Sequence, residues 1–370
     1  MASADWYIID NVDELDTPAL VVYADRVQYN IDLVKTMIDD VLRLRPHVKT
    51  HKSIDVSRLM IAAGIAKFKC ATIAEAEMLG MANASDVLLA YQPTGPKLKR
   101  FIELIKAYPQ TSYSCLLDNQ DTAGAISKAA VDDHITIAVY IDLNVGMNRS
   151  GIITADALAL YEVCANLPGI KLIGLHAYDG HIHDADYTIR QQRSDESIQP
   201  VLKLVDAIIA KGYHKPVVIA GGSPTFPILA KRAGLECSPG TFVYWDKGYQ
   251  DAFPEQLFLP AALLIARVIS LPEEGKICID LGHKSVSAEN ELAKRVYFLN
   301  APELKFTGHS EEHLVADAGI GHHYKVGDIL YGLPYHVCPS VALYERAISI
   351  ENKLITGEWK TIARDRKITI

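Results

Sequence analysis

The sequence predicts an α/β protein that combines a (β/α)8 barrel of the TIM type with a C-terminal all-β domain. Three observations predict it. Apolar, strand-like runs alternate with helical stretches over roughly 230 residues, which is the size and rhythm of such a barrel. Polar and glycine-rich segments follow several of the expected strands, where a barrel carries its functional residues. After about residue 255 the alternation gives way to short strand-like runs separated by Gly, Pro and Asn, which indicates a separate β-rich domain.

Eight apolar runs are the expected barrel strands. They cover residues 19–23, 44–50, 67–71, 86–91, 112–117, 135–143, 171–178 and 217–220. Apolar residues at helical spacing predict helices between them, over residues 26–41, 51–63, 74–81, 96–108, 120–130, 155–167 and 195–211. A doubly wound open sheet shares this alternation. No Gly-x-Gly-x-x-Gly follows the first strand, however, which weakens a dinucleotide-binding version of that alternative.

The second domain is expected to consist of short strands. They cover residues 263–270, 276–281, 295–299, 313–316, 329–331 and 341–344, followed by a β-rich tail that ends at residue 370. Pro18 closes a mixed segment at the start of the chain, and this segment is expected to join the strands. We therefore divide the chain into a barrel, residues 19–255, and a β-rich domain made of residues 1–18 and 256–370.

Composition and charge are typical of a globular enzyme. Of the 370 residues, 49% are hydrophobic and 22% are charged, so a sizeable core can form. A net charge of −8 argues against nucleic acid or an anionic membrane as a partner, and no apolar run is long enough for a membrane span. The N-terminus lacks the features of a signal peptide, and six scattered cysteines are typical of free thiols in a reducing compartment. We expect a cytoplasmic protein.

The stretch Arg45–Lys52 is the first candidate for a functional site. Read as a strand that ends in a loop, it places Lys49 on the same face as His47 and His51. A lysine packed among other cations loses its proton more readily, and a free amine beside a cofactor aldehyde forms a Schiff base. The alternative is a basic surface loop, and the octapeptide alone does not decide between the two.

Two further strand ends carry residues suited to anions. Gly221-Gly222-Ser223, followed by Thr225, can bind phosphate, because glycines let main-chain N–H groups approach closely and hydroxyls add donors. Arg149, in a glycine-flanked loop, can donate to an anionic oxygen. The alternatives are an ordinary turn for the first segment and a solvated loop arginine for the second.

His336 and Cys338 are the candidate metal ligands. In an extended segment, His-x-Cys places both side chains on one face, and imidazole with thiolate suits zinc or another borderline divalent ion. Two protein ligands leave positions open for water and substrate, as at catalytic metal sites. The alternative is a core cysteine beside a hydrogen-bonded histidine.

Four motifs together resemble the D-threonine aldolase / D-serine dehydratase family of fold-type III pyridoxal-phosphate enzymes. They are RPHVKTHK at 45–52, GMNRSG at 146–151, GGSPT at 221–225 and PYHVCP at 334–339. The resemblance runs from about residue 15 to about residue 346. It implies a barrel of the alanine racemase N-terminal type, pyridoxal 5'-phosphate, and a divalent metal ion (zinc, or manganese, magnesium or cobalt). It also implies a head-to-tail homodimer with sites at the subunit interface.

The same resemblance assigns roles to individual residues. It makes Lys49 the Schiff-base lysine, with His47 beside it in the cofactor site. Arg149 corresponds to the arginine that faces the phenolic oxygen of the cofactor, and Tyr178 to a tyrosine beside the pyridine ring. The phosphate turn and the metal pair correspond to Gly221, Gly222, Ser223 and Thr225, and to His336 and Cys338.

A lyase that acts on D-3-hydroxy amino acids is the function that the resemblance implies, with D-serine, D-threonine and D-3-hydroxyaspartate as candidate substrates. Cys338 favours elimination of water, because dehydratase members resemble this chain in having Cys there, whereas D-threonine aldolases have Asp. The alternative is retro-aldol cleavage to glycine and an aldehyde, with His181 or His183 as the candidate base.

Two other functions remain open. An amino-acid racemase on the same barrel does not need the His336-x-Cys338 pair. A non-enzymatic pyridoxal-phosphate carrier has the barrel alone, and the additional domain of about 110 residues argues against it.

Overall fold

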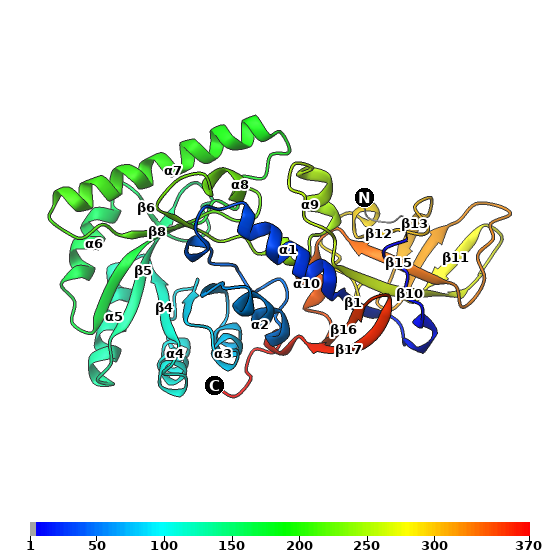
Figure 1. The fold of residues 1–370 in the computed structure, drawn as a ribbon, viewed down its shortest axis with the longest axis horizontal. Helices are drawn as coiled ribbons and strands as arrows, with labels where there is room; N and C mark the ends of the chain where they lie inside the picture. Colours follow the sequence, from blue (N-terminus) through cyan, green and yellow to red (C-terminus); the bar gives the residue numbers. More distant parts are fainter. Residues whose placement is uncertain (1–4) are drawn as a thin grey trace. The chain divides into compact units, whose positions relative to one another are not determined.

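The chain divides into two compact units in the computed structural model, which describes residues 5–370. The β unit comprises the chain up to Leu33, Thr50–Val56 and Thr241–Arg364. The barrel unit comprises Val34–Lys49, Ser57–Gly240 and Asp365–Ile370. Figure 1 shows both units, with labels on many of their helices and strands. Within residues 5–370, no helix is long and apolar enough to cross a membrane.

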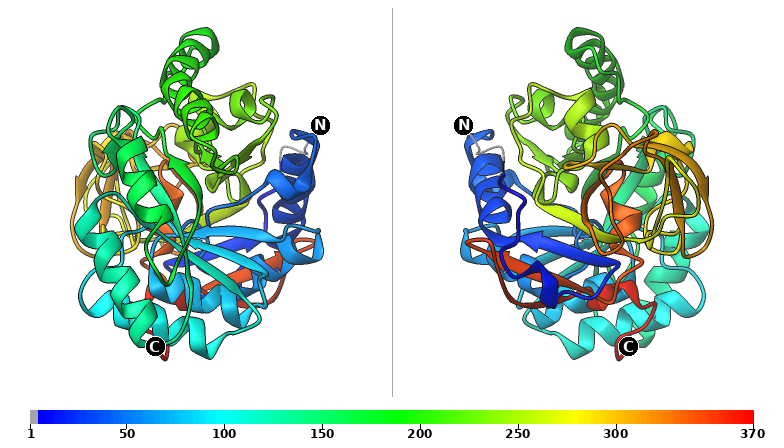
Figure 2. Two further views of the ribbon diagram at one scale, coloured as in Figure 1. Left: turned by 90° about the vertical axis from the view of Figure 1, so that its left-hand side faces the viewer. Right: turned by 90° about the vertical axis from the view of Figure 1, so that its right-hand side faces the viewer.

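The barrel unit is built on a parallel sheet. Its strands follow the order β2-β3-β4-β5-β7-β8-β9, and the short β6 pairs with β5. Their bounds are β2 Lys67–Cys70, β3 Asp86–Leu89, β4 Ser112–Leu117, β5 Ile137–Asn144, β6 Ile152–Ile153, β7 Ile170–Ala177, β8 Val217–Ala220 and β9 Leu235–Cys237. Helices connect the strands, as parallel pairing requires, and lie around the outside of the sheet (Figure 2).

The segment Leu44–Val48 closes this sheet into a ring. Leu44 bridges in parallel to Cys237 of β9, and His47 bridges in parallel to Lys69 of β2. Main-chain hydrogen bonds of 2.8–3.0 Å run along both seams. With this segment, the described part of the chain contains the eight parallel strands of a (β/α)8 barrel, and the predicted fold class is confirmed.

The helices begin where the sequence supplies a cap. Thr72, Asn119 and Asp186 cap α3, α5 and α7, and each side chain accepts a hydrogen bond from a first-turn N–H group. The bounds are α1 Ala24–Thr36, α2 Ile54–Ala62, α3 Ile73–Met81, α4 Pro96–Ala107, α5 Gln120–Asp132, α6 Ala157–Ala165, α7 Tyr187–Ala210, α8 Phe226–Leu229, α9 Lys247–Ala252 and α10 Val337–Val341. Short 3-10 helices cover Val12–Glu14, Val41–Arg43, Thr241–Val243, Leu292–Lys294 and Ile362–Arg364. Helix α7 begins earlier than predicted because Asp186 caps it.

The β unit is built on a second, largely antiparallel sheet. Its strands follow the order β13-β14-β11-β10-β1-β16-β17, with β15 on β10 and β12 on β15. Their bounds are β1 Ala19–Tyr23, β10 Ala262–Ser270, β11 Lys276–Ile279, β12 Val296–Phe298, β13 Lys305–His309, β14 Leu314–Asp317, β15 Ile329–Pro334, β16 Arg346–Glu351 and β17 Leu354–Lys360. The predicted strand-rich C-terminal domain is confirmed.

One predicted barrel strand belongs to the other sheet, one predicted strand of the second domain is not a strand, and one strand of the barrel ring was missed. Ala19–Tyr23 is not in the barrel, because it pairs with β10 and β16 of the β unit. Its place in the ring is taken by β9. This strand has three residues, and its charged central residue, Glu236, interrupts the apolar run by which a buried strand is recognised in the sequence. Residues 341–344 end α10 and form a turn instead of a strand. An apolar run specifies an extended conformation but not the sheet that it joins, because its pairing partners are distant in sequence.

Side chains fill the barrel in layers. At the amino ends of the strands, the buried Arg45 lies 2.6 Å from Asp86 and 2.8 Å from Glu236. The next layer is apolar and includes Leu88, Leu116, Tyr140 and Ile219. At the carboxyl ends, polar side chains replace apolar ones, and it is here that a barrel places its chemistry.

Candidate active site

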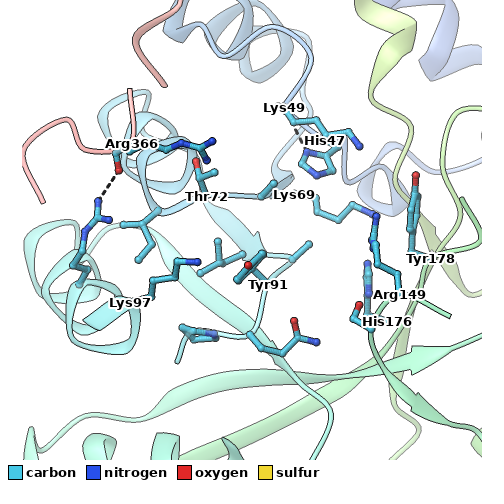
Figure 3. A pocket seen from close by; sticks show the side chains of 18 residues that line it. His47, Lys49, Lys69, Thr72, Tyr91, Lys97, Arg149, His176, Tyr178 and Arg366 are labelled. Atoms are coloured by element: carbon cyan, nitrogen blue, oxygen red, sulfur yellow. Dashed lines mark hydrogen bonds between the residues drawn. The ribbon is translucent and has the colours of Figure 1, made fainter. Parts of the chain in front are cut away.

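A cavity of about 690 Å³ opens at the carboxyl ends of the barrel strands (Figure 3). This volume is in the range of small-molecule sites. Tyr178 and Arg149 lie at one end, and Arg366 and Lys97 lie at the other (Figure 3). The polar side chains that line it are His47, Lys49, Lys69, Thr72, Tyr91, Gln92, Lys97, Arg100, Arg149, Ser150, His176, Tyr178 and Arg366.

Lys49 reaches the cavity from the end of the segment Leu44–Val48. Its main-chain N–H group donates to Nδ1 of His47, 3.2 Å away, and both side chains lie at one edge of the cavity (Figure 3). The structure thus brings together two of the residues that the sequence singled out.

His51 does not share this face, so that expectation is wrong. The chain turns directly after His47, and the two-residue side-chain period holds only while the backbone is extended. His51 is buried in the β unit, where its Nδ1 accepts a hydrogen bond from the N–H group of Ser53.

Three cations gather on one side of the Tyr178 ring (Figure 3). The Nζ atoms of Lys49 and Lys69 lie 6.0 and 5.2 Å from the ring centre, and the guanidinium carbon of Arg149 lies 5.1 Å from it. These distances allow cation–π attraction. Three like charges in one place also favour an anionic ligand.

Lys69, on β2, was missed by the sequence interpretation. It is 2% exposed, and its ammonium group makes no hydrogen bond or ion pair with residues 5–370. Burial and the charge of Lys49 lower the pKa of Lys69 to about 7, although Asp179 and Asp142 act in the opposite direction. The signal that could have identified Lys69 is a lysine inside a strand that a barrel buries on both faces.

Asp142 and His176 form a buried pair at the same end of the cavity. Nδ1 of His176 lies 2.7 Å from Asp142, which also accepts hydrogen bonds from Ser150 and Gln92 at 2.9 and 3.0 Å. Burial lowers the pKa of His176 despite the opposing effect of Asp142, so the imidazole is neutral. Because the carboxylate can only accept, we assign the Nδ1 proton to His176. Its buried Nε2, which has no partner among residues 5–370, is then an acceptor.

The turn that begins at Gly221 lies against Tyr178. A Cβ atom on Gly222 would come within 3.1 Å of the tyrosine ring. Gly221 has a φ of +75°, a conformation that side-chain-bearing residues rarely adopt. The turn is therefore placed beside the cation cluster, although its own residues do not line the cavity.

Thr225 holds this turn from within. Its hydroxyl oxygen accepts a hydrogen bond from the N–H group of Gly222 at 3.3 Å, and its proton goes to Asp179 at 3.0 Å. Ser223 accepts a hydrogen bond from the N–H group of Gly240 at 3.1 Å. Burial raises the pKa of Asp179 to about 6, against the effects of Thr225 and Lys69. Thr225 thus shapes the predicted phosphate turn through internal bonds.

His181 and His183, the candidate bases, do not line the cavity. His181 packs against the loop after β5, because a Cβ atom on Gly146 would lie 2.7 Å from its Nε2. Burial and the charge of Arg193 lower the pKa of His181. His183 is exposed. Their catalytic role remains a prediction.

Residues 366–370 belong to the barrel unit and bring Arg366 to the cavity. Buried Glu77 accepts hydrogen bonds from the side chain and N–H group of Thr369 and from the N–H group of Ile370. Arg100 donates to the main-chain oxygens of Arg366 and Ile370, each at 3.0 Å or less. These contacts fix the segment, and the sequence alone could not predict them because 266 to 293 residues separate the partners.

The candidate metal ligands lie in the β unit and do not form an extended segment. Strand β15 ends at Pro334, His336 is the N-cap residue of α10, and Cys338 lies in the first turn of that helix. The prediction of an extended His-x-Cys pair is therefore wrong. The side chains still meet, because a hydrogen bond links them.

The surroundings of this pair are polar. His336 also contacts Glu289 through Nδ1, and Sγ of Cys338 lies 3.2 Å from Oγ1 of Thr50. Burial acts to lower the pKa of His336, but Cys338, Glu289 and the charge of Asp246 raise it to about 9. Among residues 5–370, no group of three or more His, Cys, Asp or Glu side chains is arranged to hold a metal ion. The site therefore offers two protein donors.

With this geometry established, comparison with known proteins defines the family. The family "Alanine racemase, N-terminal domain" matches residues 22–247, and "Putative serine dehydratase domain" matches residues 261–350. The chain belongs to the alanine racemase N-terminal domain family. The resemblance that the motifs indicated is confirmed.

Its relatives include lyases of D-amino acids. The D-threonine aldolase of an Arthrobacter species is 26% identical and aligns over 96% of this chain and 94% of its own. The D-threo-3-hydroxyaspartate dehydratase of Delftia sp. (strain HT23) is 26% identical, over 94% and 98% of the two chains. A solved D-threonine aldolase from Filomicrobium marinum has a TM-score of 0.86 at 24% identity and covers 95% of this chain and 96% of its own. Alanine racemase from Clostridium difficile 630 has a TM-score of 0.74 at 15% identity, over 94% and 99%.

Proposed function

We propose that the chain is a pyridoxal-phosphate-dependent lyase that acts on D-3-hydroxy amino acids. The observation that carries the proposal is Lys49, at the carboxyl end of a barrel strand, beside Lys69 and Arg149 in a cavity of ligand size. The two relatives named above, an aldolase and a dehydratase, support a lyase.

The cavity fits pyridoxal phosphate. Its cations suit the anionic groups of the cofactor, Tyr178 offers a ring face, and Lys49 offers an amine for the aldehyde. The unpartnered Nε2 of His176 offers a buried acceptor. When bound, the cofactor supplies an electron sink for a developing carbanion.

The residues of the chain would bind and orient the cofactor and move the proton. Lys49 would hold the cofactor through its amine, and the same amine would be the base for the α-proton of the substrate. Arg149 neutralises negative charge on the ring, and Asp142 fixes the orientation of His176 through the 2.7 Å hydrogen bond. The turn at residues 221–225 is the proposed phosphate-binding segment, beside the cation cluster, although the N–H groups of Gly221 and Gly222 donate to Ala177 and Thr225 in the cofactor-free protein.

A divalent metal ion on His336 and Cys338 is part of the proposal. A thiol and an imidazole in contact are chemically suited to zinc and to other borderline ions. A solved structure of a cysteine-to-alanine mutant of a D-threo-3-hydroxyaspartate dehydratase is described as a metal-free form, which supports a metal in that relative. Such an ion would act as a Lewis acid toward a substrate hydroxyl.

Elimination of water is favoured over retro-aldol cleavage. Cys338, instead of Asp, is the observation from the sequence. The cavity adds a second, because retro-aldol cleavage needs a base at the β-hydroxyl, and neither His181 nor His183 lines it. Retro-aldol cleavage remains the second candidate, supported by the aldolases among the relatives.

The far end of the cavity favours a substrate with a second carboxylate. Lys97, Arg100 and Arg366 line it there, and Nζ of Lys97 lies 4.3 Å from the centre of the Tyr91 ring. We therefore favour D-3-hydroxyaspartate over D-serine and D-threonine. A head-to-tail homodimer and a cytoplasmic location also remain proposals, and the dimer can be tested by analytical ultracentrifugation.

Product analysis tests the proposal. The cofactor-loaded protein is given D-3-hydroxyaspartate, D-threonine or D-serine, with and without a metal chelator. A keto acid plus ammonia, lost with the chelator, identifies the dehydratase, whereas chelator-sensitive glycine plus an aldehyde identifies the aldolase. Formation of the L-isomer regardless of the chelator would identify a racemase and contradict the role given to His336 and Cys338.

A further inference from the structure

Lys49 and Lys69 both face the cavity beside Tyr178, and Lys69 has no individual role in the proposal above. Lys69 lies on β2, where its main-chain N–H group donates to Pro46 at 2.8 Å and its carbonyl accepts from Val48 at 2.9 Å. These two bonds join the backbone of Lys69 to the segment Leu44–Val48, across the seam that closes the barrel. The position of Lys69 is therefore fixed by the sheet, whereas Lys49 lies in the turn that follows the strand segment.

No described carboxylate of the barrel forms a hydrogen bond or an ion pair with Lys69. Asp142 accepts hydrogen bonds from His176, Ser150 and Gln92, and Asp179 accepts from Thr225. The other charges that act on Lys69 are those of Lys49 and Arg45, which are both positive. A buried ammonium without a bonded partner costs stability, so a purely structural role does not explain a lysine here.

We propose that Lys69 is a positioning residue whose ammonium group binds the anionic cofactor on the cavity side of Tyr178, together with Arg149. The inference rests on the proposed cofactor, pyridoxal phosphate. The bound anion supplies the bonded partner that no carboxylate of the barrel provides for Lys69. Lys49 forms the covalent bond, and Lys69 contributes charge and orientation.

This role makes cofactor binding depend on pH. Lys69, with a pKa of about 7 in the cofactor-free protein, is mainly charged at pH 6 and mainly neutral at pH 9. The gain in cofactor affinity that Lys69 provides is fully present below pH 7. Above pH 7 this gain falls about tenfold per pH unit, until Lys69 is neutral in the bound state as well. Lys49, Arg149, Asp142, Asp179 and His176 face the same space, so only a comparison of variants isolates Lys69.

The experiment measures the dissociation constant of pyridoxal phosphate for the full chain by equilibrium dialysis at pH 6 and pH 9. The variants are Lys69→Met, which keeps the length and removes the charge, and Lys69→Arg, which restores the charge. Lys67→Met is the matched control, because Lys67 lies on the same strand but pairs with Glu236. Thermal unfolding of each variant shows that it is folded.

We expect Lys69→Met to bind the cofactor about tenfold or more weakly at pH 6, as for a lost charge-assisted hydrogen bond. At pH 9 the difference shrinks to about twofold or less. Lys69→Arg regains most of the affinity, and Lys67→Met binds like the parent protein. Equal affinity of Lys69→Met and the parent at pH 6 overturns the inference and leaves the proposed function intact.

A second readout separates positioning from covalent attachment. Borohydride reduction followed by peptide mapping locates the amine that is bonded to the cofactor. Attachment at Lys49 in both the parent and Lys69→Met supports the inference, and attachment at Lys69 in the parent overturns it. If the parent protein binds no pyridoxal phosphate at either pH, the proposed function fails as well.

Discussion

Each end of the barrel interior contains a buried cation, Arg45 or Lys69, but only Arg45 is bonded to carboxylates. The basal cluster, at the amino ends of the strands, consists of Arg45, Lys67, Asp86 and Glu236, joined by ion pairs. The mouth cluster, at the carboxyl ends, consists of Lys49, Lys69 and Arg149 around Tyr178. An apolar layer that includes Leu88 and Tyr140 occupies the barrel interior as well.

The directions of the pKa shifts express this difference. Burial acts to lower the pKa of Arg45, but Asp86 and Glu236 outweigh it and raise the pKa above the ordinary value. Burial and Lys49 together lower the pKa of Lys69. A buried charge that is fully paired serves the fold, whereas a buried charge without a partner is retained where a ligand completes the pairing. The same residue types thus form bonded ion pairs at one end, and at the other end they are the residues that we propose for binding.

The largest effect is expected from Lys49→Ala, in the mouth cluster. Loss of the only cavity amine that is proposed to bond the cofactor should reduce turnover of D-3-hydroxy amino acids at least ~10³-fold. Stability should change little, because Lys49 is partly exposed. Steady-state kinetics and a thermal melt measure the two quantities. Turnover within tenfold of the parent would show that Lys49 is not the essential amine.

In the basal cluster, Arg45→Met should affect stability instead of chemistry. It leaves Asp86 and Glu236 without their central partner, and breaking such a buried network costs about 3–5 kcal/mol. Urea unfolding of the cofactor-free protein measures the loss. The double variant Arg45→Met/Glu236→Gln should recover part of it, because one uncompensated charge is removed. A loss below about 1 kcal/mol would contradict the view that the basal cluster holds the barrel.

The sequence was sufficient to predict the barrel and the β-rich domain, and it singled out two of the three cations of the mouth cluster. Lys49 and Arg149 follow strands and stand in unusual local sequences, so local pattern was enough to select them. Lys69 stands in Lys-Phe-Lys-Cys, which also fits an amphipathic edge strand, and only closure of the ring shows that it is buried.

Other features depend on partners that are distant in sequence. The run at Ala19–Tyr23 pairs with strands more than 200 residues away, so its local pattern could not exclude the barrel. The strand that replaces it was missed because Glu236 interrupts the run, and Glu236 is there to bond Arg45 and Lys67. At His336-x-Cys338, the hydroxyl of Ser340 donates to the carbonyl of His336 at 2.9 Å in a helical turn, which a two-residue period could not predict.

Lys69→Met tests whether the mouth cluster costs stability. Replacing an unpaired buried charge by an apolar group of similar length should stabilise the cofactor-free protein by about 1–4 kcal/mol at pH 7. The pKa of Lys69 is about 7 in the folded protein and about 10.4 when unfolded. The unfolded state therefore binds more protons between these values, and this residue makes stability rise with pH across that window.

Below pH 7 both states are protonated and the folded state carries the full cost of the buried charge, whereas above about pH 10.4 neither state is charged. Urea unfolding from pH 6 to pH 10 should show this rise in the parent and a smaller rise in Lys69→Met. Lys67→Met is the control and should be slightly destabilised. A parent and a Lys69→Met variant with parallel pH profiles would mean that Lys69 has a bonded partner in the cofactor-free protein.

The smallest effect is expected at the outer end of the cavity, where Arg366 is exposed. An exposed charge contributes about 0.5–1 kcal/mol to an ion pair, so Arg366→Ala should raise KM for D-3-hydroxyaspartate about two- to fivefold and leave kcat unchanged. KM for D-serine, which has no second carboxylate, should stay the same. Arg364→Ala is the matched control, because Arg364 is an exposed arginine two residues earlier in the sequence, belongs to the β unit and does not line the cavity. An equal rise in KM for both substrates would mean that Arg366 supports the shape of the cavity and does not recognise the second carboxylate. The mouth cluster would then be the remaining anion site of the cavity.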